Sequence, residues 1–252
     1  MINRIADYLQ EPFINGTATI MSQNVDKQEI EKFARLAAQW WDAEGELKTL
    51  HQINPIRLSY ILEKTSVIDK YVIDIGCGGG ILTESLAQQG AQVTGIDMNE
   101  EALKIAKLHQ KELGPTVEYL YTTAETIGAE RPGTYDIVTC FELLEHVPDP
   151  ASIVNACAAL VKPGGHVFFS TLNRNLKSYF FAIVGAEYLL KLLPKNTHDF
   201  AHFIRPSELR AWIRAAGLQL SEFKGVSYNM VTKQLRLSDD ISVNYLCYAK
   251  RS

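Results

Sequence analysis

Residues 71–80 read Tyr-Val-Ile-Asp-Ile-Gly-Cys-Gly-Gly-Gly, and this stretch decides the fold class. The run from Val72 to Ile75 has the β-branched, apolar character of a strand that is buried on both faces. After the glycines, apolar residues recur at helical spacing from Ile81 to Ala87. We therefore predict a central strand, a tight glycine turn and a helix, an arrangement in which the backbone can approach a ligand closely.

The spacing of the glycines narrows the choice of ligand. From Asp74 to Gly80 the pattern is Asp-x-Gly-x-Gly-x-Gly. A dinucleotide fingerprint requires Gly-x-Gly-x-x-Gly, and counting from Gly76 its last position falls on Ile81. The mismatch argues against a nicotinamide oxidoreductase, which is the rival from another enzyme class.

A second short strand, residues 92–96, ends at the carboxylate of Asp97. Asp97 lies 21 positions after Gly76 (97 − 76), about where an α/β nucleotide site places the acid that accepts a ribose hydroxyl. Each feature alone has a plainer explanation, since a glycine run can be a simple turn and a strand-end Asp can cap a helix. Together they favour a nucleoside-bearing ligand, and they resemble the S-adenosylmethionine site of the class I methyltransferases.

Composition excludes several other classes. The chain has 252 residues, of which 46% are hydrophobic and 21% charged, with a formal net charge of −4, so a nucleic-acid partner is not expected. The four cysteines are widely spaced, which favours buried thiols in a reducing cytoplasm over a disulfide frame or a zinc site. The longest apolar stretch, Tyr179 to Ala186, is too short to span a bilayer, which takes about 20 residues.

The pattern along the chain predicts one domain. We expect residues 1–24 to be a loosely ordered extension and residues 25–252 to form a single domain, with N-terminal helices in 25–69 and an insertion at 174–205. One helix should begin at Asp26 and a second should follow Pro55. The remaining expected elements are strands at 71–75, 92–96, 117–121, 135–140, 165–171, 218–228 and 241–248, and helices near 80–89, 99–113, 150–161 and 206–216. The alternation predicts a mostly parallel seven-stranded sheet with an antiparallel edge strand and helices on both faces.

Ligands of such sheets lie beyond the carboxyl ends of the strands. There the backbones of Gly76 and Gly78 would face the amino-acid part of the cofactor, and Asp97 would hold its ribose. The Ala124-Glu125 turn would flank the adenine. Phe141 follows the fourth strand and either contacts the cofactor or serves as a core aromatic.

The next segment, Glu142-Leu143-Leu144-Glu145-His146, leaves two interpretations open. One helical turn would bring Glu142, Glu145 and His146 together as ligands for a divalent cation. Alternatively, Glu142 and His146 are solvated and the segment only caps the helix that Pro148-Asp149-Pro150 begins.

Several segments resemble the ubiquinone-biosynthesis O-methyltransferases, over residues from about Val25 to the C-terminus. They are Trp40-Trp41-Asp42 with Glu44-Gly45, Asn54-Pro55-Ile56-Arg57-Leu58, the glycine motif from Asp74 to Gly80, Leu144-Glu145-His146-Val147-Pro148-Asp149-Pro150, Ser170-Thr171-Leu172-Asn173-Arg174-Asn175, Gly185-Ala186-Glu187-Tyr188 and Thr197-His198-Asp199. The glycine motif indicates only a class I methyltransferase, and the tryptophan and Ser-Thr-Leu-Asn-Arg-Asn segments narrow the resemblance to this family.

The resemblance implies a Rossmann-like class I fold and transfer of a methyl group from S-adenosylmethionine to ring hydroxyls of polyprenylated phenols. It carries the cofactor role over to Arg57, which can grip a carboxylate in a bidentate fork, and to Gly76, Asp97 and Phe141. The family often has methionine in place of Phe141, which favours a backbone contact there. Related enzymes are described as magnesium-dependent, which favours the interpretation of Glu142, Glu145 and His146 as metal ligands. Alternatively, His146 is a general base that accepts the proton of the phenol.

His198 is a third candidate for activating the phenol, after a metal ion and His146.

The insertion is apolar and basic between 177 and 193, and we expect it to make a peripheral contact with the inner face of the membrane in an otherwise cytoplasmic protein. A lid or a dimer surface is the alternative. The resemblance leaves open whether the protein works within a larger quinone-biosynthesis assembly. Two other functions remain at this stage, namely a methyltransferase for another small acceptor and a non-catalytic cofactor-binding module.

Overall fold

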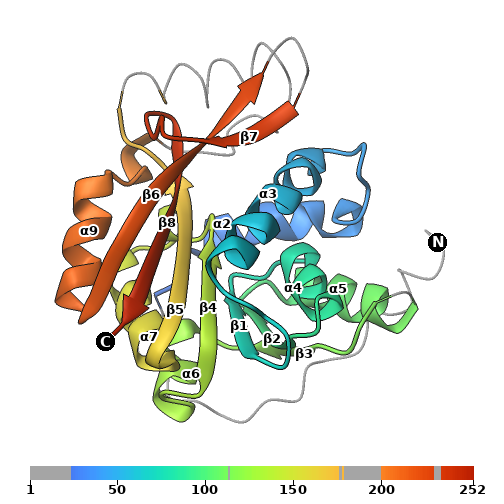
Figure 1. Ribbon diagram of the computed structural model, residues 1–252. Coiled ribbons are helices and arrows are strands. Elements are labelled where there is room, and N and C mark those ends of the chain that lie inside the picture. Colours follow the sequence, from blue (N-terminus) through green and yellow to red (C-terminus); the bar gives the residue numbers. More distant parts are fainter. Residues whose placement is uncertain (1–23, 113, 176–177, 179–199, 230–233) are drawn as a thin grey trace.

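The computed structural model describes residues 24–252 except 113, 176–177, 179–199 and 230–233 (Figure 1). Its strands form one eight-stranded sheet in the order β3-β2-β1-β4-β5-β8-β6-β7. The strands are β1 (Tyr71–Ile75), β2 (Gln92–Asp97), β3 (Glu118–Tyr121), β4 (Tyr135–Phe141), β5 (Val161–Leu172), β6 (Leu218–Asn229), β7 (Gln234–Ser238) and β8 (Asn244–Arg251). The helices are α2 (Lys27–Leu36), η1 (Ala37–Gln39), α3 (Lys48–Lys64), α4 (Ile81–Gln88), α5 (Glu100–Glu112), α6 (Ala124–Glu130), η2 (Leu144–His146), α7 (Pro150–Leu160), η4 (Phe200–His202) and α9 (Pro206–Ala215).

The first half of the sheet is parallel and buried on both faces. β1 pairs with β2 and β4, β2 pairs with β3, and β4 pairs with β5, all in parallel. Apolar residues of α6, α7 and α9 form a core on one face, and those of α3, α4 and α5 form a core on the other (Figure 1). The predicted α/β fold with helices on both faces is therefore confirmed, because a parallel sheet needs cover on both sides.

The sheet has eight strands, one more than the predicted seven, and the additional strand lies in its second half. β8 lies between β5 and β6 and is antiparallel to both, and β7 forms the edge, antiparallel to β6. The two antiparallel strands predicted at the end of the chain are present as β6 and β8, and the antiparallel strand at the edge is β7, which was not predicted. Residues Tyr245 to Ala249 of β8 are all buried, as their interior position requires.

Two helices and one turn differ from the sequence expectations. α3 begins at Lys48 and contains Pro55, so it does not start after that proline. The expected turn at Ala124 is the start of α6, whose first turn is capped when Thr123 Oγ1 accepts a hydrogen bond from Thr126 N at 3.2 Å. Glu142 has φ +50°, so the residues from Glu142 to His146 do not form one continuous helical turn.

All four cysteines are buried and none is in a disulfide, which confirms the prediction of buried thiols. In the part of the chain that the structure describes, no helix combines the length and the apolar character needed to cross a bilayer.

Candidate functional site

The glycine turn lies between β1 and α4 and is tied to the neighbouring strand. The backbone N–H groups of Gly76 and Cys77 both donate to the carbonyl oxygen of Ile96 in β2, at 2.9 and 3.0 Å. Gly76, Gly78 and Gly80 have φ values of 75°, 52° and 89°. This left-handed backbone is what residues without a Cβ allow, so the glycine spacing read from the sequence follows from the shape of the turn.

The carboxylate of Asp97 closes the same turn from the end of β2. Its Oδ2 accepts a hydrogen bond from Gly78 N, and its Oδ1 accepts one from Asn99 N, both at 2.7 Å. Burial raises the pKa of this carboxyl, although these backbone donors oppose the rise. The structure therefore brings Asp97, Gly76 and Gly78 together at the carboxyl ends of adjacent strands, as the sequence predicted.

Asp74 is a buried acid beneath the turn that the sequence analysis counted in the motif but did not treat as a site residue. Its two carboxylate oxygens accept hydrogen bonds from the hydroxyls of Thr83 and Thr139, each at 2.7 Å. Burial is the main cause that raises its pKa to about 6. The carboxyl links β1 to α4 and β4, and an acid inside an otherwise apolar strand was the signal that could have identified it.

Arg57 extends from α3 to the rim of β4. Its Nη2 lies 2.9 Å from Glu142 Oε1, and its guanidinium carbon lies 5.5 Å from the centre of the Phe141 ring. The residue is only 7% exposed, and its Nε finds no hydrogen-bond partner among the described residues. A buried guanidinium N–H without an acceptor suits an anionic ligand group such as a carboxylate.

Two tryptophans cover the turn, a contact that the sequence did not reveal. A Cβ added at Gly78 would overlap the Trp40 ring, so the indole packs directly on the glycine backbone. The indole N–H of Trp41 donates to the carbonyl oxygen of Gly79 at 2.9 Å, and its ring stacks on His109 with centroids 3.4 Å apart. The segment that follows α2 is thereby held against the turn.

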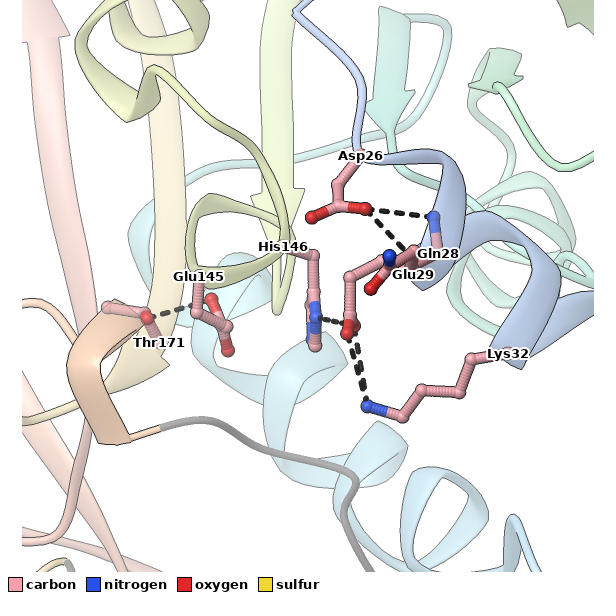
Figure 2. Close-up of polar contacts among 7 residues, drawn as sticks. All are labelled: Asp26, Gln28, Glu29, Lys32, Glu145, His146 and Thr171. Carbon is pink, nitrogen blue, oxygen red and sulfur yellow. Dashed lines mark hydrogen bonds and ion pairs between the residues drawn. The ribbon is translucent and has the colours of Figure 1, made fainter.

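The three predicted metal ligands lie close in the chain but contact different partners. Glu142 accepts from the Ser170 hydroxyl at 2.7 Å besides pairing with Arg57. Figure 2 shows the Glu145 side chain directed to Thr171 and the His146 ring directed to Glu29, with hydrogen bonds of 2.8 and 2.7 Å.

Among the residues that the structure describes, no group of three or more His, Cys, Asp or Glu side chains is arranged to hold a metal ion. Glu145 is buried, and burial together with the neighbouring charge of Glu142 raises its pKa well above the ordinary value. The three side chains are hydrogen-bonded to separate residues, so the arrangement as it stands does not gather them around one magnesium ion. His198 and nearly all of the 177–193 segment lie outside the described residues.

Comparison with known proteins identifies the family to which the chain belongs. A family model described as a methyltransferase domain matches residues 31–222. The ubiquinone biosynthesis O-methyltransferase of Saccharophagus degradans is 58% identical over 234 residues, which cover 92% of this chain and 99% of that protein. The enzyme of the same name from Stutzerimonas stutzeri is 60% identical over 223 residues, or 88% of this chain and 96% of that protein.

This chain belongs to the ubiquinone biosynthesis O-methyltransferase family. The glycine turn, Asp97 and Arg57 are therefore features of a methyltransferase domain, and the resemblance seen in the sequence is confirmed.

Solved structures support the fold. A magnesium protoporphyrin IX methyltransferase from Synechocystis, determined with bound S-adenosylhomocysteine, is similar with a TM-score of 0.59 at 18% identity, covering 100% of this chain and 94% of that one. A SAM-dependent methyltransferase from Methanosarcina mazei gives a TM-score of 0.57 at 22% identity, covering 76% of this chain and 96% of that one. At these identities the likeness bears on the fold alone.

Proposed function

We propose that this methyltransferase transfers a methyl group from S-adenosylmethionine to a ring hydroxyl of a polyprenylated phenol in ubiquinone biosynthesis. The observation that carries the proposal is the near end-to-end identity to enzymes that share one functional name, 58% over 92% of the chain in one case. Similarity of this extent covers the segments that follow β5 as well as the glycine turn.

The cofactor is held by the residues that converge on the turn. Arg57 supplies a buried Nε donor without an acceptor, which suits the methionine carboxylate. Gly76 and Gly78 give the turn its left-handed backbone, and the Asp97 carboxylate can accept hydrogen bonds from the ribose hydroxyls. Phe141 is the last residue of β4, at the same rim, and its backbone is the part we assign to the cofactor.

When bound, S-adenosylmethionine supplies a methyl group that is already activated on a sulfonium. The task left to the protein is to make the phenol nucleophilic. With a phenol pKa near 10, forming the oxyanion at pH 7 costs about 4 kcal/mol. A positioned general base offsets part of this cost, and His146, at the rim beyond β4, is the residue we assign to accept the phenol proton.

The test is methyl transfer in vitro. The purified protein is incubated with methyl-labelled S-adenosylmethionine and a demethylated polyprenyl catechol, and we expect a labelled ring O-methyl product. His146→Asn should lower kcat while calorimetry still detects S-adenosylhomocysteine. Absence of product with every phenol offered, despite cofactor binding, would leave only another acceptor or a non-catalytic role. Binding of NAD in place of S-adenosylhomocysteine would refute the cofactor assignment.

A magnesium role for Glu142, Glu145 and His146 stays a prediction from the resemblance, and no step above depends on it. Prolonged dialysis against a chelator tests it directly. Activity that is lost on dialysis and restored by added magnesium would support a cation site that forms with the substrate. Unchanged activity would dismiss it.

We also propose that residues 177–193 make the peripheral membrane contact that a polyprenyl substrate requires. The sequence of this segment combines Phe180, Phe181 and a leucine cluster with Lys177 and Lys191, a composition suited to a lipid interface. The variant with Phe180→Glu and Phe181→Glu should lose flotation with anionic liposomes. Flotation equal to that of the wild type would rule out this segment as the contact.

A further inference from the structure

The second half of the glycine turn consists of three consecutive glycines, residues 78–80. Two of them have φ values of 52° and 89°, and glycine loses more conformational freedom on folding than any other residue. The first half of the turn is tied to β2 by the N–H groups of Gly76 and Cys77. The carbonyl oxygen of Gly79 is held from outside the sheet, since it accepts a hydrogen bond from the indole N–H of Trp41 at 2.9 Å.

The Trp41 ring is itself held in place by two histidines. Its face stacks on His109, with ring centroids 3.4 Å apart and ring planes 3° apart. His51 meets the indole edge-on at a centroid distance of 6.0 Å, and its Nε2 lies 2.9 Å from the carbonyl oxygen of Trp40. A stacked ring fixes the plane of the indole, and that plane decides where the N–H points.

His109 is fixed in turn by a buried carboxyl group. The side chain of Glu84 is only 1% exposed, and its Oε2 lies 2.9 Å from His109 Nδ1. Glu84 lies in α4, which begins directly after the glycine turn, whereas His109 lies in the last turn of α5. The turn is therefore held both by the helix that it starts and by the segment that follows α2, and His109 joins the two.

We propose that His109 is a positioning residue for cofactor binding. It holds the Trp41 indole N–H on the Gly79 carbonyl and so keeps the glycine turn in the shape that receives S-adenosylmethionine. This inference rests on the proposed function, in which the cofactor lies against that turn. A turn that is already ordered loses less freedom when the cofactor binds, so the affinity is higher. A role in packing alone would instead lower the stability of the fold and leave the affinity of the folded protein unchanged.

The experiment is a double-mutant cycle on the affinity for S-adenosylhomocysteine. His109→Ala removes the stacked ring, and Trp41→Phe keeps a ring but removes the N–H donor. His166→Ala is the matched control, because His166 also stacks on an aromatic ring, that of Tyr248, but pairs with Ile137 in the first half of β4, away from the turn. Calorimetry on the full-length proteins measures the affinity, and urea unfolding of each variant reports the stability separately.

We expect His109→Ala and Trp41→Phe each to weaken binding about 5- to 10-fold, the ratio that one hydrogen bond contributes, and His166→Ala to bind as the wild type does. Because both substitutions act on the same hydrogen bond, the double variant should bind at most about twofold more weakly than either single variant. Independent effects would multiply to at least about 25-fold. Multiplied effects overturn the proposal, and so does an affinity of His109→Ala or of Trp41→Phe equal to that of the wild type.

NMR of the ¹⁵N-labelled indole groups tests the same contact in the wild-type protein itself. The chain has three tryptophans, and the signal of Trp41 is the one that is missing from Trp41→Phe. We expect the Trp41 N–H of the wild type to exchange slowly with solvent, and that of His109→Ala to exchange at least about 10-fold faster. A wild-type Trp41 N–H that exchanges as fast as an exposed indole would overturn the proposal even if His109→Ala did not fold.

A failure of the proposed function gives a different result. If the wild type does not bind S-adenosylhomocysteine, or if Arg57→Lys and Trp41→Phe both leave its affinity unaltered, the cofactor does not lie against this turn and the positioning role falls with it. If Arg57→Lys weakens binding but His109→Ala does not, the cofactor placement stands and His109 has no positioning role.

Discussion

Asp74 makes the stability of this protein depend on pH in an unusual direction. Burial raises its pKa from 3.8 to about 6, despite hydrogen bonds from Thr83 and Thr139. A raised carboxyl pKa means that the folded state prefers the protonated form, so the stability gained from protonation is fully present below pH 3.8 and is lost as pH rises through about 6. At about 1.4 kcal/mol per pKa unit, the loss for this one group is about 3 kcal/mol, an order-of-magnitude value.

Asp74→Asn removes the titration and keeps the shape, since an amide can accept from one threonine hydroxyl and donate to the other. We expect urea unfolding to show the variant gaining stability relative to the wild type by about 2 kcal/mol between about pH 4.5 and about pH 7.5. Glu44→Gln, which removes an exposed carboxyl, should show no comparable gain. A difference between Asp74→Asn and the wild type that stays constant across this pH range would refute the reasoning.

Three further predictions concern the turn and its cover. Arg57→Lys should weaken S-adenosylhomocysteine binding by about 10- to 100-fold in calorimetry, because losing a charge-assisted hydrogen bond costs about 1.5–3 kcal/mol, and unchanged affinity would exclude Arg57 from the cofactor site. Gly78→Ala should lower the free energy of unfolding by at least about 1 kcal/mol, since its φ of 52° and the Trp40 ring leave no place for a Cβ; equal stability in urea would contradict this. Trp41→Phe should lose the hydrogen bond to the carbonyl oxygen of Gly79, which should lower the free energy of unfolding by about 1 kcal/mol. A thermal midpoint equal to that of the wild type would show that this hydrogen bond is dispensable.

Local pattern predicted the parallel half of the fold well. The strands β1 and β4 are largely apolar and buried along most of their length, and a run of this kind can be satisfied only inside a covered parallel sheet. The second half was harder to predict. β7 pairs with a strand only on one side and has no fully buried residue, so its sequence carries little of the alternation by which a strand is recognised.

The candidate site was likewise predicted only in part. The positions of Gly76, Gly78 and Asp97 follow from the chain itself, because a strand, a tight turn and the end of the next strand are local features whose meeting point is set by parallel topology. Glu142, Glu145 and His146 illustrate the limit of this reasoning. Their spacing predicts a shared ligand, which stays a prediction, and it gave no sign that each side chain also has a hydrogen-bond or ion-pair partner far away in sequence.

The sequence by itself therefore determined the α/β class, the glycine turn and the family, since these depend on residue order and short-range backbone geometry. Only the tertiary structure decided that Trp40 packs on the turn, that Arg57 reaches Glu142, and that Glu29 meets His146. The physical reason is that such contacts depend on how α2, η1 and α3 dock against the sheet. Docking is set by the packing of whole faces, which no short pattern of residues encodes.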